Sequence, residues 1–105
     1  MKEKKSTVIR GVLEEELERN ERMKNRYLLE LKKLPKGSIV LRKLGNQEYY
    51  YLNYRENKKV IAKYIGKKEV TDIKELQDGI NKRKHLQEVI KNLKQEENEI
   101  KKALR

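Results

Sequence analysis

The spacing of hydrophobic positions divides the chain into three parts. Over residues 7–34 apolar side chains recur at steps of three and four, which predicts a long amphipathic helix. Over residues 37–66 short runs of β-branched and aromatic residues alternate with turn residues, as is typical of strands. The helical spacing returns over residues 72–104. We therefore expect an α+β fold in a single domain, 1–105, with a three-stranded antiparallel meander between two long helices.

Two turn signals divide the central segment into its strands. Gly45-Asn46 is a two-residue hairpin signal, and Glu56-Asn57-Lys58 marks a second reversal of the chain. The three predicted strands are Ser38–Leu44, Gln47–Arg55 and Lys59–Ile65.

The face that each strand residue takes depends on the length of the second turn. A three-residue turn at 56–58 with a bulge predicts a nearly apolar core face: Ile39, Leu41, Tyr50, Leu52, Tyr54, Val60, Ala62 and Tyr64. The opposite face then mixes cations with aromatic rings: Val40, Arg42, Tyr49, Tyr51, Asn53, Arg55, Ile61, Lys63 and Ile65. A two-residue turn would exchange the faces of the third strand. The first alternative is favoured because it separates polar from apolar side chains more cleanly.

Both predicted helices carry a seam of the coiled-coil type. The first seam contains two polar interruptions: Leu13, Leu17, Asn20, Lys24, Tyr27, Leu31 and Leu34. The second contains Leu86, Ile90, Leu93, Glu97, Ile100 and Leu104. Because the seams have similar lengths, we expect an antiparallel coiled-coil hairpin within one chain. The alternative is that the C-terminal helix pairs with another chain and forms a homodimer.

Helix ends are predicted from capping residues. Ser6 or Thr7 can cap the first helix, and Pro35 disfavours helical geometry at the residue before it. Asp72, followed three residues later by Glu75, resembles a capping box for the second helix, with Thr71 as the rival cap.

Charge adds a candidate function to this picture. The chain has 28 basic and 17 acidic residues, a net charge of +11, and residues 36–70 alone hold nine basic and three acidic residues. Arginine and lysine pair with phosphates, arginine and asparagine can read base edges, and tyrosine can stack on a base. The candidate nucleic-acid-binding residues are Arg42, Tyr49, Tyr51, Asn53, Arg55, Lys63, Lys67 and Lys68. An exposed antiparallel sheet face is also ordinarily polar, so solvent or a protein partner is the competing interpretation.

No pattern for catalysis or metal binding is found in the sequence. Cysteine is absent and His85 is the only histidine, which we interpret as a surface residue. Tyr49-Tyr50-Tyr51 lacks the clustered arginine and histidine partners that a tyrosine nucleophile needs. We expect no catalytic residues, no metal, no cofactor and no small-molecule substrate, and therefore not an enzyme. Without a long apolar run or an apolar signal core, a cytoplasmic protein with no membrane partner is expected.

Three motifs in residues 34–68 carry a resemblance. Gly37-Ser38-Ile39, the run Tyr49 to Arg55, and Tyr64-Ile65-Gly66 resemble a group of small bacterial proteins with a GSI…YYYLxYR…GKxxxxYIG pattern, and a similar pattern opens some transposases. Asn57 and Lys58 replace the usual turn glycines. The order of three strands and a helix also resembles the AP2-like arm-binding domains of phage integrases, which implies a sheet lying in the DNA major groove.

These observations favour a small non-enzymatic nucleic-acid-binding protein, from a bacterium or its mobile elements, that grips duplex DNA with the exposed sheet face. Lys82-Arg83-Lys84 would add phosphate contacts. The alternative is a protein–protein interaction module, either an adaptor or a phage-borne inhibitor, that uses the helical seam and the tyrosines.

Overall fold

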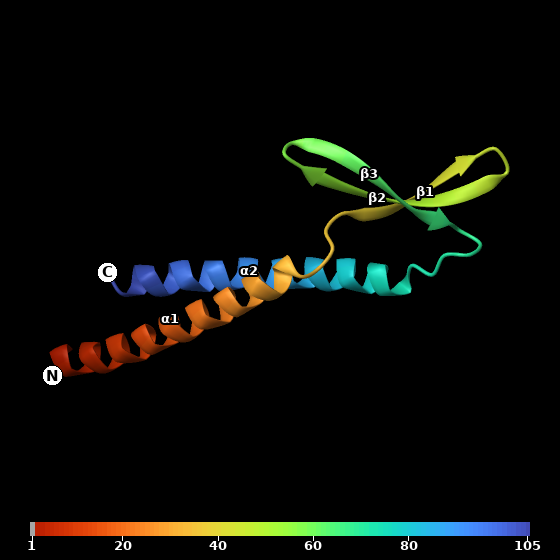
Figure 1. Cartoon of the computed structure of the whole chain (residues 1–105). Helices are drawn as coiled ribbons and strands as arrows, with labels where there is room; N and C mark the ends of the chain where they lie inside the picture. Colours follow the sequence, from red (N-terminus) through yellow and green to blue (C-terminus); the bar gives the residue numbers. More distant parts are fainter. Residues whose placement is uncertain (1) are drawn as a thin grey trace. The chain divides into compact units, whose positions relative to one another are not determined.

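The computed structural model describes the backbone of residues 2–105 and the side chains from Thr7 onward. Its elements follow the order α1, β1, β2, β3, α2 (Figure 1): Lys2–Lys32, Ser38–Leu44, Gln47–Glu56, Lys59–Lys67 and Lys74–Ala103. This is the predicted α+β arrangement of two long helices and a three-stranded antiparallel sheet. Contacts divide the chain into two compact units. The helical unit contains the residues up to Lys33 together with His85–Arg105, and the sheet unit contains Leu34–Lys84.

The first helix begins earlier than predicted. α1 starts at Lys2, so the expected caps Ser6 and Thr7 lie inside it. Lysine and glutamate, which fill all four positions 2–5, are good helix formers, and no glycine or proline interrupts them. At the other end Lys33 donates its backbone N–H to Glu30 O at 3.1 Å, and Pro35 prevents further helix.

The helical unit is an antiparallel hairpin, as the two seams predict. Arg10 of α1 donates to the carbonyl of Leu104 at 2.9 Å, whereas Lys24, further along α1, contacts Glu97, which lies earlier on α2. Leu86, Ile90 and Leu93 of α2 are buried. In Figure 1 the two chain ends accordingly lie at the same end of this unit.

Polar seam residues of the two helices are matched to one another. Asn20 is only 3% exposed and donates to Glu96 Oε2 at 3.3 Å, and Lys24 Nζ lies 2.6 Å from Glu97 Oε2. Lys101 contacts the other carboxylate oxygen of Glu97 at 2.9 Å. Hydrogen bonds from Lys24 and then Lys101 lower the pKa of Glu97 from 4.5 to about 2, and the same contact raises the pKa of Lys101. Lys24 is therefore compensated by charge on the second helix. Asn20 is satisfied only through its amide group, because its buried Oδ1 accepts no hydrogen bond from the described residues.

The first hairpin of the sheet has the predicted register. Leu44 pairs with Gln47 around the Gly45-Asn46 turn, and the pairing continues to Ser38 opposite Asn53. Gly45 has a φ of +65°, which glycine adopts without steric cost.

The second hairpin differs from the prediction, because its turn has two residues and not three. Glu56 pairs with Lys59, and the turn residues Asn57 and Lys58 have φ values of 49° and 68°. Two successive left-handed residues are the signature of a type I′ turn, whose twist matches that of the flanking strands. The faces of β3 are consequently exchanged over residues 59–64.

A bulge lies inside the second hairpin, away from the turn. Tyr51 pairs with Tyr64 and Tyr50 with Gly66, which leaves Ile65 without a partner in the ladder. Beyond the bulge Lys67 pairs with Tyr49, and Lys68 donates its backbone N–H to Glu48 O at 3.0 Å.

Two close approaches and one helix cap define the local structure of the sheet unit. A Cβ on Gly37 would collide with the backbone oxygen of Asn53, and a Cβ on Gly66 would collide with Thr71. The start of α2 is capped by Asp72, whose carboxylate accepts the backbone N–H of Lys74 at 2.9 Å. Asp72 is thus confirmed as a cap.

Candidate nucleic-acid interface

One face of the sheet gathers most of the predicted binding residues. Side chains directly opposite each other on neighbouring strands point to the same face, so the register defines its members. We call this surface the tyrosine face: Ser38, Val40, Arg42, Tyr49, Tyr51, Asn53, Arg55, Val60, Ala62, Tyr64 and Lys67. Across the three strands it consists of rows, including Arg42–Tyr49–Lys67 and Val40–Tyr51–Tyr64.

Three tyrosines and an arginine form a cluster on this face. The rings of Tyr51 and Tyr64 meet edge to face at 5.6 Å between centroids, and Tyr49 lies 6.2 Å from Tyr64 in a tilted arrangement. The guanidinium of Arg42 lies over the Tyr51 ring, 4.8 Å from its centroid. Aromatic and cation–π contacts of this kind each contribute on the order of 0.5–1.5 kcal/mol, so the cluster is ordered without a ligand.

The cluster remains accessible to a ligand. Tyr64 is 54% exposed and Val60 is 66% exposed, and Arg42, Arg55 and Lys67 are exposed at the two ends of the face. Within the described part of the chain, no member of the tyrosine face is acidic. The face therefore presents positive charge and aromatic surface together.

Two predicted site residues lie elsewhere. Lys63 pairs with Leu52 and so lies on the opposite face, because the two-residue turn exchanges the faces of β3. Lys68 follows β3 and its ammonium lies 3.6 Å from Glu48 Oε2, so a carboxylate already offsets its charge.

Asn53 lies on the tyrosine face, but its carbonyl oxygen is inaccessible. Asn53 Oδ1 is buried and accepts no hydrogen bond from the described residues. A buried oxygen cannot reach a base edge without a change of rotamer, so the role predicted for Asn53 in base reading has no support in this geometry.

Tyr64 lies on this face but is absent from the predicted site residues. It was assigned to the core face with Val60 and Ala62, and all three lie on the tyrosine face. Gly66 was the available signal, because an isolated glycine in a strand often marks a bulge. A two-residue turn made of Asn57 and Lys58 also predicts the observed faces of residues 59–64.

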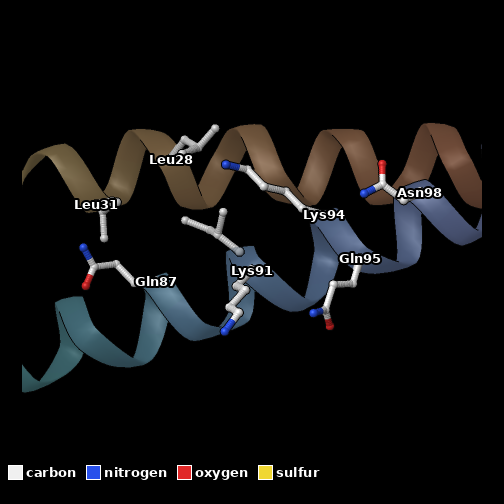
Figure 2. Close-up of a pocket in the computed structure, with 8 residues that line it drawn as sticks. Leu28, Leu31, Gln87, Lys91, Lys94, Gln95 and Asn98 are labelled. Carbon is white, nitrogen blue, oxygen red and sulfur yellow. The ribbon is translucent and has the colours of Figure 1, made fainter.

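A groove of about 380 Å³ flanks the helical hairpin (Figure 2). Leu28, Leu31 and Ile90 supply its apolar lining, and the remaining side chains are amides and lysines: Gln87, Lys91, Lys94, Gln95 and Asn98. This lining contains no carboxylate, hydroxyl or imidazole, so its polar groups are amides and ammonium groups only.

The described residues also contain no group of three histidine or acidic side chains that could hold a metal ion. Neither of the described helices has an apolar stretch sufficient to cross a lipid bilayer.

The fold and this face together define a class of α+β protein in which a helix precedes a three-stranded meander with a basic, tyrosine-rich surface. The chain belongs to the family of the domain of unknown function DUF6788, whose model matches residues 9–75. The match covers most of α1, the whole sheet and the start of α2. No curated protein and no solved structure matches this chain.

Proposed function

We propose that this is a small, non-enzymatic, cytoplasmic protein that binds duplex DNA through the tyrosine face. The observation that carries the proposal is the combination of Arg42, Arg55 and Lys67 with three clustered tyrosines on one exposed face. Cations supply affinity for the phosphate backbone, and the rings supply stacking surface or phosphate hydrogen bonds.

The dimensions of the face suit a duplex. Tyr49 and Arg55 lie six residues apart on β2, which corresponds to about 20 Å at about 3.3 Å per residue. At about 3.4 Å per nucleotide along one strand, this distance spans about six nucleotides. Neighbouring strands lie about 4.8 Å apart, so the two outer strands are separated by about 10 Å. This separation is comparable with the width of the major groove, about 12 Å.

The charge of the sheet unit supports the same proposal. Residues 34–84 include 13 basic and 6 acidic residues, a net charge of +7, against +4 for the rest of the chain. A local excess of this size favours counterion release on a polyanion and faster encounter with it.

The test is fluorescence anisotropy with labelled duplex DNA over a salt series, with single-stranded DNA and RNA as comparisons. Arg42→Ala with Arg55→Ala should weaken duplex binding at least about tenfold and reduce the slope of log affinity against log salt by about two. Lys63→Ala is the matched control, since it removes one cation from the opposite face and should change affinity little. Both variants should melt within a few degrees of the unchanged protein, because these cations are exposed.

Three results would count against the proposal. Absence of binding at low salt would refute it directly. A change in salt slope of about one for Lys63→Ala, half that of the double variant, would show non-specific attraction by net charge. Tighter binding of single-stranded DNA or RNA would reject duplex as the preferred ligand and favour stacking on Tyr64.

The second candidate is a protein-interaction module, an adaptor or a phage-borne inhibitor. It is favoured by the exposure of apolar side chains beside the aromatic cluster, of which Val60 is an example. A packed protein interface depends much less on salt than phosphate contacts do, so the same series separates the two functions. The resemblance to transposase N-terminal regions motivates a further proposal, that the protein comes from a mobile element. Dimer formation through the C-terminal helix likewise remains a proposal.

A further inference from the structure

A second heptad line follows α1 outside the seam that faces α2. Its spacing alternates between four and three residues, as in a coiled coil, and every member is exposed. We call this line the outer stripe: Val8, Val12, Glu15, Arg19, Arg22, Arg26 and Leu29. Val8, Val12 and Leu29 are each at least 60% exposed.

The hairpin does not use this surface. The helix contacts α2 through Asn20 and Lys24, and α2 in turn reaches Arg10. Two cations of the stripe have contacts within α1: Arg19 pairs with Glu16 at 2.5 Å, and Arg26 lies 5.4 Å from the centroid of the Tyr27 ring. The outer stripe is therefore a helix face without a partner among the described residues of this chain.

Part of the order of side chains along the outer stripe is self-complementary. Two valines come first, then acidic Glu15, then three arginines, and finally Leu29. Glu18, which borders the stripe, adds a second carboxylate next to Arg19. An antiparallel copy centred between residues 18 and 19 places Val8 opposite Leu29 and Glu15 opposite Arg22 at both ends. Val12 and Arg26 lie opposite Asn25 and Gly11, which are not members of the stripe.

We infer that the outer stripe of α1 binds the outer stripe of a second copy of this chain, antiparallel and around a two-fold axis. Val8 then packs on Leu29 of the second copy, Glu15 lies opposite Arg22, and Glu18 lies opposite Arg19. A two-fold axis repeats each contact, so one self-complementary surface is sufficient for a closed dimer. Another protein would need a matching charge order, whereas a second copy supplies it by symmetry.

The expected dimer is weak. From Val8 to Leu29 the stripe extends about 32 Å at about 1.5 Å per residue. A single helix–helix contact of this length buries less than the roughly 800 Å² per partner of a standard interface. The fraction of dimer should therefore be measured over micromolar to millimolar protein concentrations.

The test uses charge reversal at Glu15 and Arg22, which form no ion pair among the described residues and lie too far apart on α1 to pair with each other. Sedimentation equilibrium of the full chain, without nucleic acid, gives the dimer dissociation constant. Glu15→Arg or Arg22→Glu alone places like charges opposite each other at both symmetry-related contacts. Each single variant should therefore raise the dimer dissociation constant at least about tenfold. The double variant restores opposite charges across the interface and should return the constant to within about threefold of the unchanged protein.

Circular dichroism should show the same helix content in all four proteins, because both positions are exposed. A protein that stays monomeric at every concentration would overturn the inference. A dimer that both single reversals leave intact would also overturn it, and would point to α2 as the interface. The readout is independent of DNA binding, so failure here leaves the proposed function untouched.

Discussion

The contact between Lys24 and Glu97 gives the sharpest stability prediction. The two side chains are 17% and 14% exposed, and Nζ lies 2.6 Å from Oε2. Lys24→Met removes the charge but keeps an apolar stem that can cover the same surface. Glu97 is then left with Lys101, which is 58% exposed.

The expected loss lies between two limits. Exposed ion pairs contribute about 0.2–1 kcal/mol, and removing one partner of a buried pair costs about 3–5 kcal/mol. This pair is nearly buried, but Lys101 still compensates part of the carboxylate charge. We expect a loss of about 1–2 kcal/mol, or about 5–10 °C in melting temperature for a chain of this size.

The pH dependence follows from the lowered pKa of Glu97, about 2 against 4.5. A carboxyl group with a lowered pKa in the folded state stabilises that state fully above the unfolded value and loses this contribution on protonation. The contribution is therefore present above pH 4.5 and disappears as the pH falls toward 2. Because Lys24 is the first cause of the shift, the difference between the two proteins should shrink over the same interval.

Thermal unfolding followed by circular dichroism at pH 7 and pH 2.5 measures both effects. Arg19→Met is the control, because it breaks an ion pair whose partners are 64% and 44% exposed and should cost at most about 0.5 kcal/mol. Equal losses for Lys24→Met and Arg19→Met at pH 7 would refute the reasoning. If the stability difference between Lys24→Met and the unchanged protein stays constant on acidification, the lost stability comes from packing.

Two further predictions concern left-handed residues of the sheet unit. Lys58 has a φ of 68°, so Lys58→Gly should relieve strain and stabilise the protein by about 0.5–1 kcal/mol in urea unfolding; a loss of stability would contradict the type I′ turn. Gly37→Ala should cost more than about 2 kcal/mol, because a φ of 113° is combined with a collision at Asn53 O. Gly45→Ala is its control at a φ of 65° in open space and should cost only about 1 kcal/mol; equal losses would remove the steric argument.

The elements were predictable because each has a strong local signal. Gly45-Asn46 between two β-rich runs identifies the first hairpin and its register, and the steps of three and four identify both helices. The antiparallel hairpin was predictable from the equal seams, and the matching of Lys24 with Glu97 is consistent with them. The start of α1 differs from the prediction because a serine such as Ser6 can cap a helix or lie inside one. The conformation of the residues before Ser6 determines which of the two occurs.

The composition of the site was less predictable than the position of the sheet. Arg42, Tyr49, Tyr51 and Arg55 share a face because the first hairpin has a regular register. The third strand was assigned to the wrong faces, since Asn57-Lys58 lacks the glycine that usually identifies a two-residue turn. Such an error moves every residue of β3 before the bulge to the opposite face, which is why Lys63 and Tyr64 lie on each other's predicted faces.

The bulge at Ile65 has a consequence for insertions and deletions. β3 is one residue longer than the ladder that it forms, since Tyr64 and Gly66 pair with adjacent residues of β2. Deleting Ile65 would leave a continuous ladder with every other side chain on its present face. Deleting a paired residue such as Ala62 would instead turn over one end of the strand. Position 65 is thus where β3 can lose a residue without moving any other side chain to the opposite face.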